Sequence, residues 1–296
     1  MKSLTYVYCL VLSGRRPNVS RRLTAIGVPG AQGTRAIAAG RGLWLIAASV
    51  PADEYDEAAL AAGLQNLDWV SRRAMAHEAV VEQFLTARAV LPMQLFTLFT
   101  SDDRALGHVE RQRTEIVSVV TRLERKLEWG LRLTFDEQAV RDAVAAGHAP
   151  APAGSSKNGS RRADAAPRQQ RGTAYLTRKR DLLDVRRVQL EAARSEADRL
   201  FTVLERDAAD ARRRTSTEQA APGSRLLLDA AFLVPTSRTR TFRAAVNRKT
   251  KELGSAGVIV ALTGPWPPYN FISPSAVPRR TATARGLGSR RGQAAH

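Results

Sequence analysis

A stretch in the middle of the chain constrains the fold more than any other feature. Residues 143–172 are rich in alanine, proline, glycine, serine and arginine. A segment of this composition buries little apolar surface and is typical of a flexible, here basic, linker. We therefore expect an N-terminal domain over residues 1–142, a second domain over residues 173–272, and a disordered basic tail over residues 273–296.

The formal net charge of +18 is distributed unevenly along the chain. Residues 279–296 contain five arginines and no acidic residue, and residues 150–172 add four net positive charges, so these two segments hold half of the total. Arginine-rich segments attract nucleic acid, anionic membranes and acidic proteins without selecting among them. A basic nucleic-acid-binding protein that uses the linker and the tail is therefore one interpretation of this chain.

The N-terminus and the single cysteine indicate where the protein works. No run of about 18 apolar residues occurs, so no membrane-spanning helix is expected. The first apolar run lacks a small-residue cleavage site, and its residues Tyr6 and Tyr8 favour a strand over a signal peptide. Cys9 lies inside this run and is predicted to be a buried, unreactive thiol. A reducing compartment, the cytoplasm, is the expected location.

The first part of the chain shows several strands. Residues 3–12 are apolar on both faces, which is typical of a central strand, and residues 43–50 predict a second buried strand. Residues 90–99 predict a strand interrupted at Pro92, and the alternation over residues 129–135 predicts a half-buried strand. The glycine-rich residues 27–33 do not have the spacing of a dinucleotide-binding loop and predict turns.

Two long helices accompany these strands. The apolar spacing predicts a helix from about Asp68 onward, with His77 at the border of its buried face as a hydrogen-bonded structural residue. Ser101 is a suitable N-cap for a second helix that continues to about Leu127, with Asp102 in its first turn. Strands mixed with long helices predict an α+β sandwich for this domain, ferredoxin-like in outline.

The second part of the chain combines long helices with a small sheet. Residues 173–214 contain neither glycine nor proline and predict one or two charged helices. Residues 225–234 predict a buried strand and residues 239–253 a helix capped around Gly254. Residues 257–262 predict a further buried strand, which should end where the prolines begin.

The proline-rich residues 263–271 follow that last strand, and two interpretations of them stay open. Their aromatic side chains could fold back onto the core, or they could form a stiff platform for a partner. The candidate partner-binding residues are Trp266, Pro267, Pro268, Tyr269 and Phe271.

Motifs of known catalytic or metal-binding chemistry do not occur in the sequence. It contains no Walker loop, nucleophile elbow, HExxH motif or CxxC pair. Four histidines and one cysteine are too few for a convincing metal cluster, and most carboxylates fall on charged helix faces. We therefore expect no enzymatic activity, no cofactor and no metal.

Taken together, the ordered motifs resemble the gas vesicle protein family that groups GvpF and GvpL. The matching motifs are Tyr6-Val7-Tyr8, Leu67-Asp68-Trp69-Val70, Ala76-His77-Glu78-Ala79-Val80-Val81, Val90-Leu91-Pro92-Met93 with Phe96-Thr97, Glu128-Trp129-Gly130, Tyr175-Leu176-Thr177-Arg178-Lys179-Arg180, Ala230-Ala231-Phe232-Leu233-Val234 and Leu262-Thr263-Gly264-Pro265-Trp266-Pro267-Pro268-Tyr269-Asn270-Phe271. The last motif is the most specific. The sequence departs from the family at Cys9, at residues 93–95 and in its basic C-terminal extension.

The resemblance implies an accessory or minor structural role in building gas vesicles, which are gas-filled shells made mainly of the small apolar protein GvpA. It implies an N-terminal α+β domain and a C-terminal domain with long helices and a small sheet. The implied partners are GvpA and other gas vesicle accessory proteins, with no membrane and no specific nucleic acid. The implied location is the gas vesicle in the cytoplasm.

Overall fold

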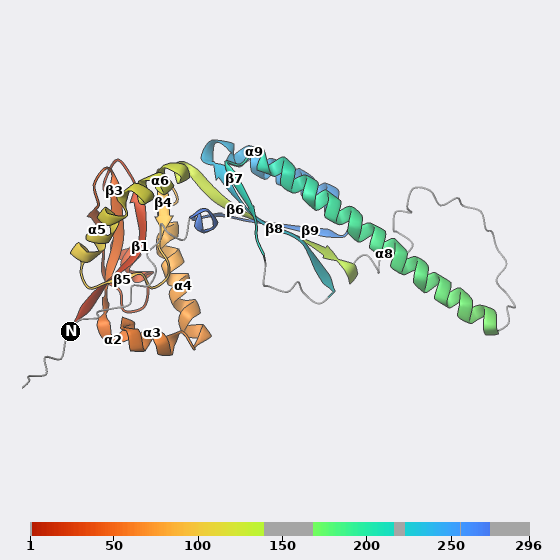
Figure 1. Cartoon of the computed structure of the whole chain (residues 1–296), viewed down its shortest axis with the longest axis horizontal. Helices are drawn as coiled ribbons and strands as arrows, with labels where there is room; N and C mark the ends of the chain where they lie inside the picture. Colours follow the sequence, from red (N-terminus) through yellow and green to blue (C-terminus); the bar gives the residue numbers. More distant parts are fainter. Residues whose placement is uncertain (1, 139–167, 216–222, 255, 273–296) are drawn as a thin grey trace, which may run out of the picture. The chain divides into compact units, whose positions relative to one another are not determined.

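A computed structural model describes residues 2–138, 168–215, 223–254 and 256–272 (Figure 1). It divides the chain into two compact units, each with its own sheet. The first unit comprises the chain up to Leu127 together with the segment that begins at Trp266, and the second unit comprises residues 128–265. The fold is α+β, as predicted.

The unit boundaries differ from the predicted domain ranges. The strand over residues 129–135 was expected in the first domain, but it belongs to the sheet of the second unit. The segment from Trp266 to Phe271 was expected in the second domain, but it belongs to the first unit. Most of the predicted linker and all of the predicted tail lie outside the described residues, and residues 168–172 open a long helix.

The first unit is built on a five-stranded antiparallel sheet. Its strands are β1 (Ser3–Leu12), β2 (Gln32–Ala38), β3 (Leu43–Pro51), β4 (Ala89–Pro92) and β5 (Leu98–Phe99). The order is β2-β3-β1-β4, with β5 also paired to β1. This is the strand order of a ferredoxin-like βαββαβ unit. Strand β1 is central, as predicted, and its residues from Tyr6 to Val11 are completely buried.

Helices surround this sheet, and the longest of them is α4. They are α1 (Arg21–Ala25), α2 (Ala52–Tyr55), α3 (Glu57–Gly63), α4 (Leu67–Glu82), α5 (Asp102–Arg111) and α6 (Arg113–Leu123). The predicted cap is confirmed, because the Ser101 hydroxyl accepts a hydrogen bond from the backbone N–H of Arg104 at 3.3 Å.

Two predictions in the first unit need correction, and one is confirmed. The single helix expected after Ser101 breaks at Gln112 into α5 and α6, and the break lets Arg113 donate a side-chain hydrogen bond to the carbonyl of Ala39 at 2.8 Å. The predicted interruption at Pro92 is confirmed, because β4 ends at Pro92 and is separated from β5 by a turn in which Phe96 has a positive φ of 65°. Strand β2 begins at Gln32, within the last two residues of the predicted turns, and continues through residues for which no strand was predicted.

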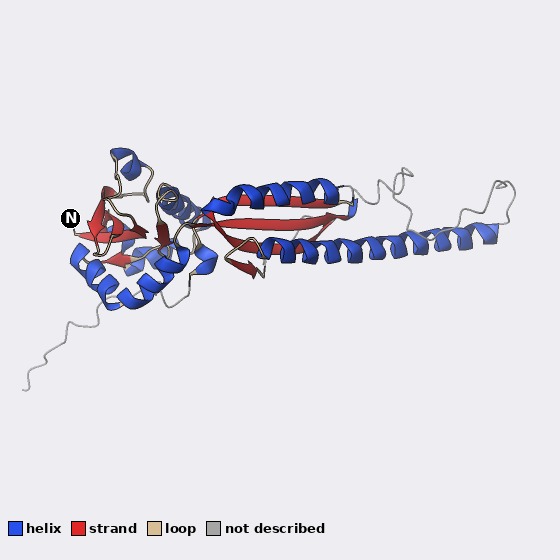
Figure 2. Ribbon diagram, turned by 90° about the horizontal axis from the view of Figure 1, so that it is seen from above, coloured by secondary structure: helices blue, strands red, loops and turns tan. Residues whose placement is uncertain are grey.

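The second unit repeats the same strand order with a much longer first helix, α8 (Figure 2). Its elements are β6 (Lys126–Asp136), α8 (Arg168–Glu205), β7 (Asp210–Arg213), β8 (Ser224–Pro235), the 3₁₀ turn η1 (Thr236–Arg238), α9 (Thr239–Gly254) and β9 (Val258–Trp266); the 3₁₀ turn η2 (Tyr269–Phe271) follows in the first unit. The order β7-β8-β6-β9 matches β2-β3-β1-β4, so both units are βαββαβ arrangements. Strand β7 was not predicted, because residues 173–214 were expected to be helical throughout.

Strand β9 corrects the prediction that a buried strand ends before Pro265. The strand continues to Trp266, and its side chains alternate between buried or half-buried and exposed positions. Proline is tolerated at the edge of a sheet, where its missing N–H costs no ladder hydrogen bond. Because β9 is an edge strand next to β6, Pro265 can extend it rather than end it.

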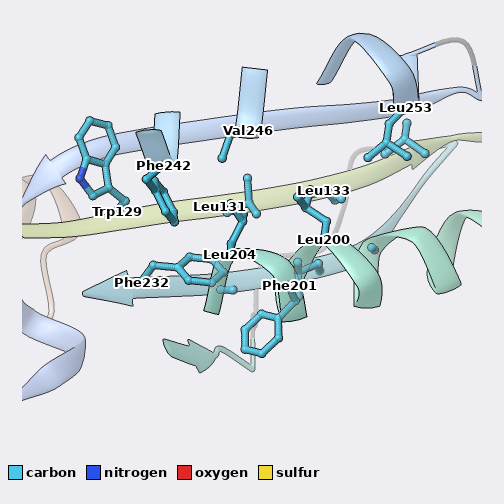
Figure 3. Close-up of a cluster of buried hydrophobic side chains, with 14 of the residues drawn as sticks. Trp129, Leu131, Leu133, Leu200, Phe201, Leu204, Phe232, Phe242, Val246 and Leu253 are labelled. Carbon is cyan, nitrogen blue, oxygen red and sulfur yellow. The ribbon is translucent and has the colours of Figure 1, made fainter. Parts of the chain in front are cut away.

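The core of the second unit lies between its sheet and its two helices (Figure 3). Alternate residues of β6 point into this core, from Trp129 to Phe135. Phe232 of β8 stands between Phe201 of α8 and Phe242 of α9, with ring centroids 5.4 Å apart in each pair. These aromatic contacts join both helices to one face of the sheet.

We predict that Phe232→Ala lowers the free energy of unfolding of the second unit by about 3–5 kcal/mol, because the cavity cannot be filled by the two neighbouring rings. Urea unfolding followed by circular dichroism measures this loss. Ile259→Ala is the control, because Ile259 on β9 is 54% exposed and its truncation should cost less than about 1 kcal/mol. Equal losses in the two variants would contradict this account of the core.

Candidate interaction site

The candidate partner-binding residues are the last residue of β9 and the segment after it, and this segment belongs to the first unit. Phe271 is completely buried, and its carbonyl accepts a hydrogen bond from the Arg122 guanidinium of α6. The Tyr269 hydroxyl donates a hydrogen bond of 2.5 Å to the Glu78 carboxylate of α4. The segment is therefore held at two points, one on α6 and one on α4.

The five candidate residues divide into a buried group and an exposed group. Pro267, Pro268 and Phe271 are buried, whereas Trp266 and Tyr269 are each 39% exposed. Two backbone hydrogen bonds fold the segment into a turn: the N–H of Tyr269 donates to the carbonyl of Pro267 at 2.8 Å, and the N–H of Phe271 donates to the carbonyl of Pro268 at 3.0 Å. The first group packs as a core segment, and the second group is available for contact with other molecules.

The charge of Glu78 affects the pKa values of two neighbouring side chains. Burial raises the pKa of Tyr269, and the hydrogen bond and the charge of Glu78 raise it further. The Tyr269 hydroxyl therefore keeps its proton at any physiological pH and acts as a donor to the carboxylate. Glu78 also adds to the effect of burial in raising the pKa of Cys9, which is completely buried as predicted.

Beneath α4 lies a buried polar cluster around His77. The Tyr6 hydroxyl is 2.8 Å from Nδ1 of His77, and its oxygen accepts the backbone N–H of Phe96 at 3.4 Å. The Tyr6 hydroxyl and the imidazole share a hydrogen bond, which confirms the predicted structural, hydrogen-bonded histidine. Burial lowers the pKa of His77 to about 4, so the imidazole is neutral in the folded protein.

Arg73 completes the buried side of α4. Its guanidinium lies 3.8 Å from the ring centroid of Trp69 and 5.2 Å from that of Tyr55. The positive charge of Arg73 is stabilised by these ring faces and by the Glu54 carboxylate, 3.5 Å away. Because Arg73 and His77 are both buried, neither is available to a molecule that approaches from solvent.

The outward side of α4 carries large apolar side chains that the sequence analysis did not single out. Leu67 is 79% exposed and Met75 is 72% exposed. Within the described chain, the first unit's exposed large apolar side chains come only from the α3–α4 corner and the segment bound to it, namely Leu64, Leu67, Met75, Trp266 and Tyr269. A helical projection could have found Met75, which lies about 160° from the buried His77 at 100° per residue.

The glycine-rich loop at residues 27–33 has a packing role. A Cβ on Gly27 would lie only 2.6 Å from the Tyr8 hydroxyl, which accepts the backbone N–H of Val28 at 3.1 Å. The Tyr55 hydroxyl donates to the carbonyl of Pro29 at 2.6 Å. The loop is thus a set of turns folded over two buried tyrosines, as predicted.

Among the described residues, no group of three or more histidine, cysteine, aspartate or glutamate side chains is placed to hold a metal ion. In the same part of the chain, no helix is long and apolar enough to cross a membrane.

Comparison with known proteins identifies relatives along nearly the whole chain. Residues 4–273 match the family described as gas vesicle synthesis protein GvpL/GvpF. Gas vesicle protein L of Streptomyces sp. (strain CB03234) is 30% identical over 231 residues, which cover 76% of this chain and 78% of the relative. Gas vesicle protein F of the same strain is 25% identical over 268 residues, which cover 90% of this chain and 99% of the relative.

Two crystal structures share the fold. The gas vesicle protein GvpF from Anabaena sp. PCC7120 superposes with a TM-score of 0.57 at 13% identity, covering 92% of this chain and 96% of that protein. GvpF from Microcystis aeruginosa gives a TM-score of 0.56 at 12% identity, covering 92% of this chain and all of that protein.

We predict that protonation of His77 destabilises the first unit in acid. The folded-state pKa of about 4 lies below the unfolded value of 6.5, so the unfolded chain binds more protons between these values. This contribution to stability is present above pH 6.5 and is lost as the pH falls toward 4. At about 1.4 kcal/mol per pH unit, the loss amounts to about 3 kcal/mol.

The variant His77→Gln tests this prediction, because its side-chain oxygen can still accept the Tyr6 hydroxyl but does not titrate. Urea unfolding is measured for both proteins across the acidic range. The stability advantage of the wild type should shrink as the pH falls, while the carboxylates common to both proteins cancel in the difference. A difference that stays constant with pH would rule out a neutral buried His77.

Proposed function

Because the chain belongs to the gas vesicle synthesis protein GvpL/GvpF family, we propose that it is an accessory protein of gas vesicle assembly that binds the apolar shell protein GvpA during vesicle nucleation or growth. In this proposal it acts by binding and not by catalysis. It works in the cytoplasm, at the growing vesicle, together with other gas vesicle accessory proteins.

The observation that carries the proposal is the fixed pair of exposed aromatic side chains, Trp266 and Tyr269. They stand on a segment whose own core residue, Phe271, is buried. Partially exposed aromatic rings are the side chains that most often dominate protein interfaces, because they bury a large apolar area and lose little rotamer freedom. Because Tyr269 is bound to α4 and Phe271 to α6, the segment that carries the two rings needs little ordering when a partner binds.

The exposed residues of the α3–α4 corner extend this platform. Leu64, Leu67 and Met75 lie in the same unit, and α4 is joined to the platform by the hydrogen bond from Tyr269 to Glu78. Apolar side chains gathered in one region of a surface are typical of a binding site for another protein. An apolar shell subunit needs such a site before it joins the shell, because its unshielded surface would otherwise aggregate.

We predict that Trp266→Ala weakens binding of GvpA at least about tenfold, which corresponds to about 1.4 kcal/mol, without loss of fold. Tyr269→Phe should weaken it less, because the ring stays and only the hydrogen bond to Glu78 is lost. Pull-down with purified GvpA measures binding, and circular dichroism checks the fold.

Two controls separate binding from stability. Ile259→Ala removes an exposed apolar side chain from the second unit and should leave binding unchanged. Phe271→Ala should lower the stability of the first unit by about 3–5 kcal/mol, because the ring is completely buried. A folded Trp266→Ala protein that binds GvpA as the wild type does would overturn the platform.

A further inference from the structure

We propose that one copy of this chain binds a second copy head to tail, with the acidic outer face of α4 on one molecule against the basic stripe of α9 on the next. The acidic face lies on the first unit and the basic stripe on the second. The contact therefore joins two unlike surfaces of identical chains. Such a heterologous contact produces rings or filaments rather than closed twofold dimers. The inference does not depend on the proposed binding of GvpA.

The acidic face is an exception in a chain with a net charge of +18. Residues 52–83, which include α2, α3 and α4, contain two arginines and seven carboxylates: Asp53, Glu54, Asp56, Glu57, Asp68, Glu78 and Glu82. One of the two arginines, Arg73, is buried over aromatic rings, which leaves Arg72 as the exposed cation of the segment. This region is therefore strongly acidic although the protein is strongly basic.

The outer arc of α4 combines charge with apolar surface. At 100° per residue, Leu67, Met75, Glu78 and Glu82 fall within about 80° of one another, with Asp68 and then Arg72 beside this arc. Asp68 and Glu82 form no ion pair with any residue in the described part of the chain. These carboxylates are therefore unmatched, and they flank the exposed side chain of Met75.

Helix α9 presents the complementary surface. Its exposed arc carries Arg240, Arg243, Arg248 and Lys251 and no carboxylate, since Glu252 at the margin pairs with Lys249. Among the described residues, Arg240, Arg248 and Lys251 have no carboxylate partner, and Arg243 lies near the Trp129 ring, 5.6 Å from its centroid. The four cations of this arc form the basic stripe of α9.

The two surfaces match in length and in chemistry. From Asp68 to Glu82 the acidic face extends about 21 Å, and from Arg240 to Lys251 the basic stripe extends about 16 Å, at 1.5 Å per residue. Helices pack with their axes about 8–10 Å apart, a distance over which arginine and lysine can reach carboxylates on a facing helix. Their methylene stems can then cover Leu67 and Met75, which small anions could not do.

The test uses two variants of the full chain that each disable one surface. Asp68→Asn with Glu82→Lys removes the acidic face while leaving the Glu78 bond to Tyr269 in place. Arg240→Glu with Arg248→Glu reverses the basic stripe and leaves Arg243 on Trp129. Arg194→Glu with Arg206→Glu is the matched control for the basic-stripe variant, because it makes the same charge change at two exposed positions, one in α8 and one directly after it.

Sedimentation of the wild type at low salt should show species heavier than the monomer that dissociate as salt screens the charges. Each surface variant should be monomeric, and the control should associate as the wild type does. A mixture of the two surface variants should form a one-to-one complex and nothing larger, because each molecule keeps one working surface.

Three results would overturn the proposal. The wild type could be monomeric at every salt concentration and protein concentration. The surface variants could associate as well as the control, so that the contact lies elsewhere. Finally, a chain ending at residue 272 could lose association while both surface variants keep it, which would make residues 273–296 and not α9 the basic partner.

Discussion

The burial of Phe271 in the first unit is the contact on which the arrangement of the whole chain depends. Because this side chain is completely buried beside the Arg122 bond, the last described residues return to a unit built from the first 127. The second unit is thus an insertion within the first. Joining chain ends across so long an insertion would cost several kcal/mol of loop entropy if the insertion were unstructured.

The fold of the second unit removes most of that cost. Its first strand, β6, and its last strand, β9, are neighbours in one sheet. The Thr263 hydroxyl lies 3.5 Å from the carbonyl of Gly130, and the N–H of Asp136 donates to Gly257, so the two strands run in opposite directions. The entry and exit of the insertion therefore lie side by side, and a Cβ on Gly130 would lie 2.6 Å from the Thr263 hydroxyl. Both units also share the βαββαβ strand order, which suits insertion because its first and last strands are adjacent.

Sequence periodicity predicted the elements with many buried residues and missed those without them. Strand β1 and helix α4 were found because their apolar spacing extends over ten or more residues. Strand β7 has the sequence Asp-Ala-Arg-Arg and has no such pattern, since it is a short edge strand paired only with β8. The unit boundary was missed for a different reason: a linker in the sequence suggests that domains are contiguous, and no local signal shows that Phe271 returns to the first unit.

The position of the candidate site was predictable from the sequence, but the exposure of its side chains was not. Three prolines stiffen residues 265–268, and the aromatic residues beside them were identified from the sequence. Which rings are buried depends on α4 and α6, far away in the sequence, so the division between Phe271 and the pair Trp266 and Tyr269 needed the structure. The exposure of Leu67 and Met75 also needed the structure, because it depends on which side of α4 faces the sheet.

The hydrogen bond from Tyr269 to Glu78 links the two proposed surfaces. Tyr269 belongs to the aromatic platform, whereas Glu78 belongs to the acidic arc of α4. A partner that draws Glu78 into an ion pair weakens the support of the Tyr269 ring, and a partner that covers the ring shields the charge of Glu78. Binding at one surface therefore changes the affinity of the other, and by thermodynamic reciprocity the change is equal in both directions. Under the two proposals, self-association and capture of the shell protein are coupled through this side-chain contact, and they also compete for Leu67 and Met75, which both surfaces use.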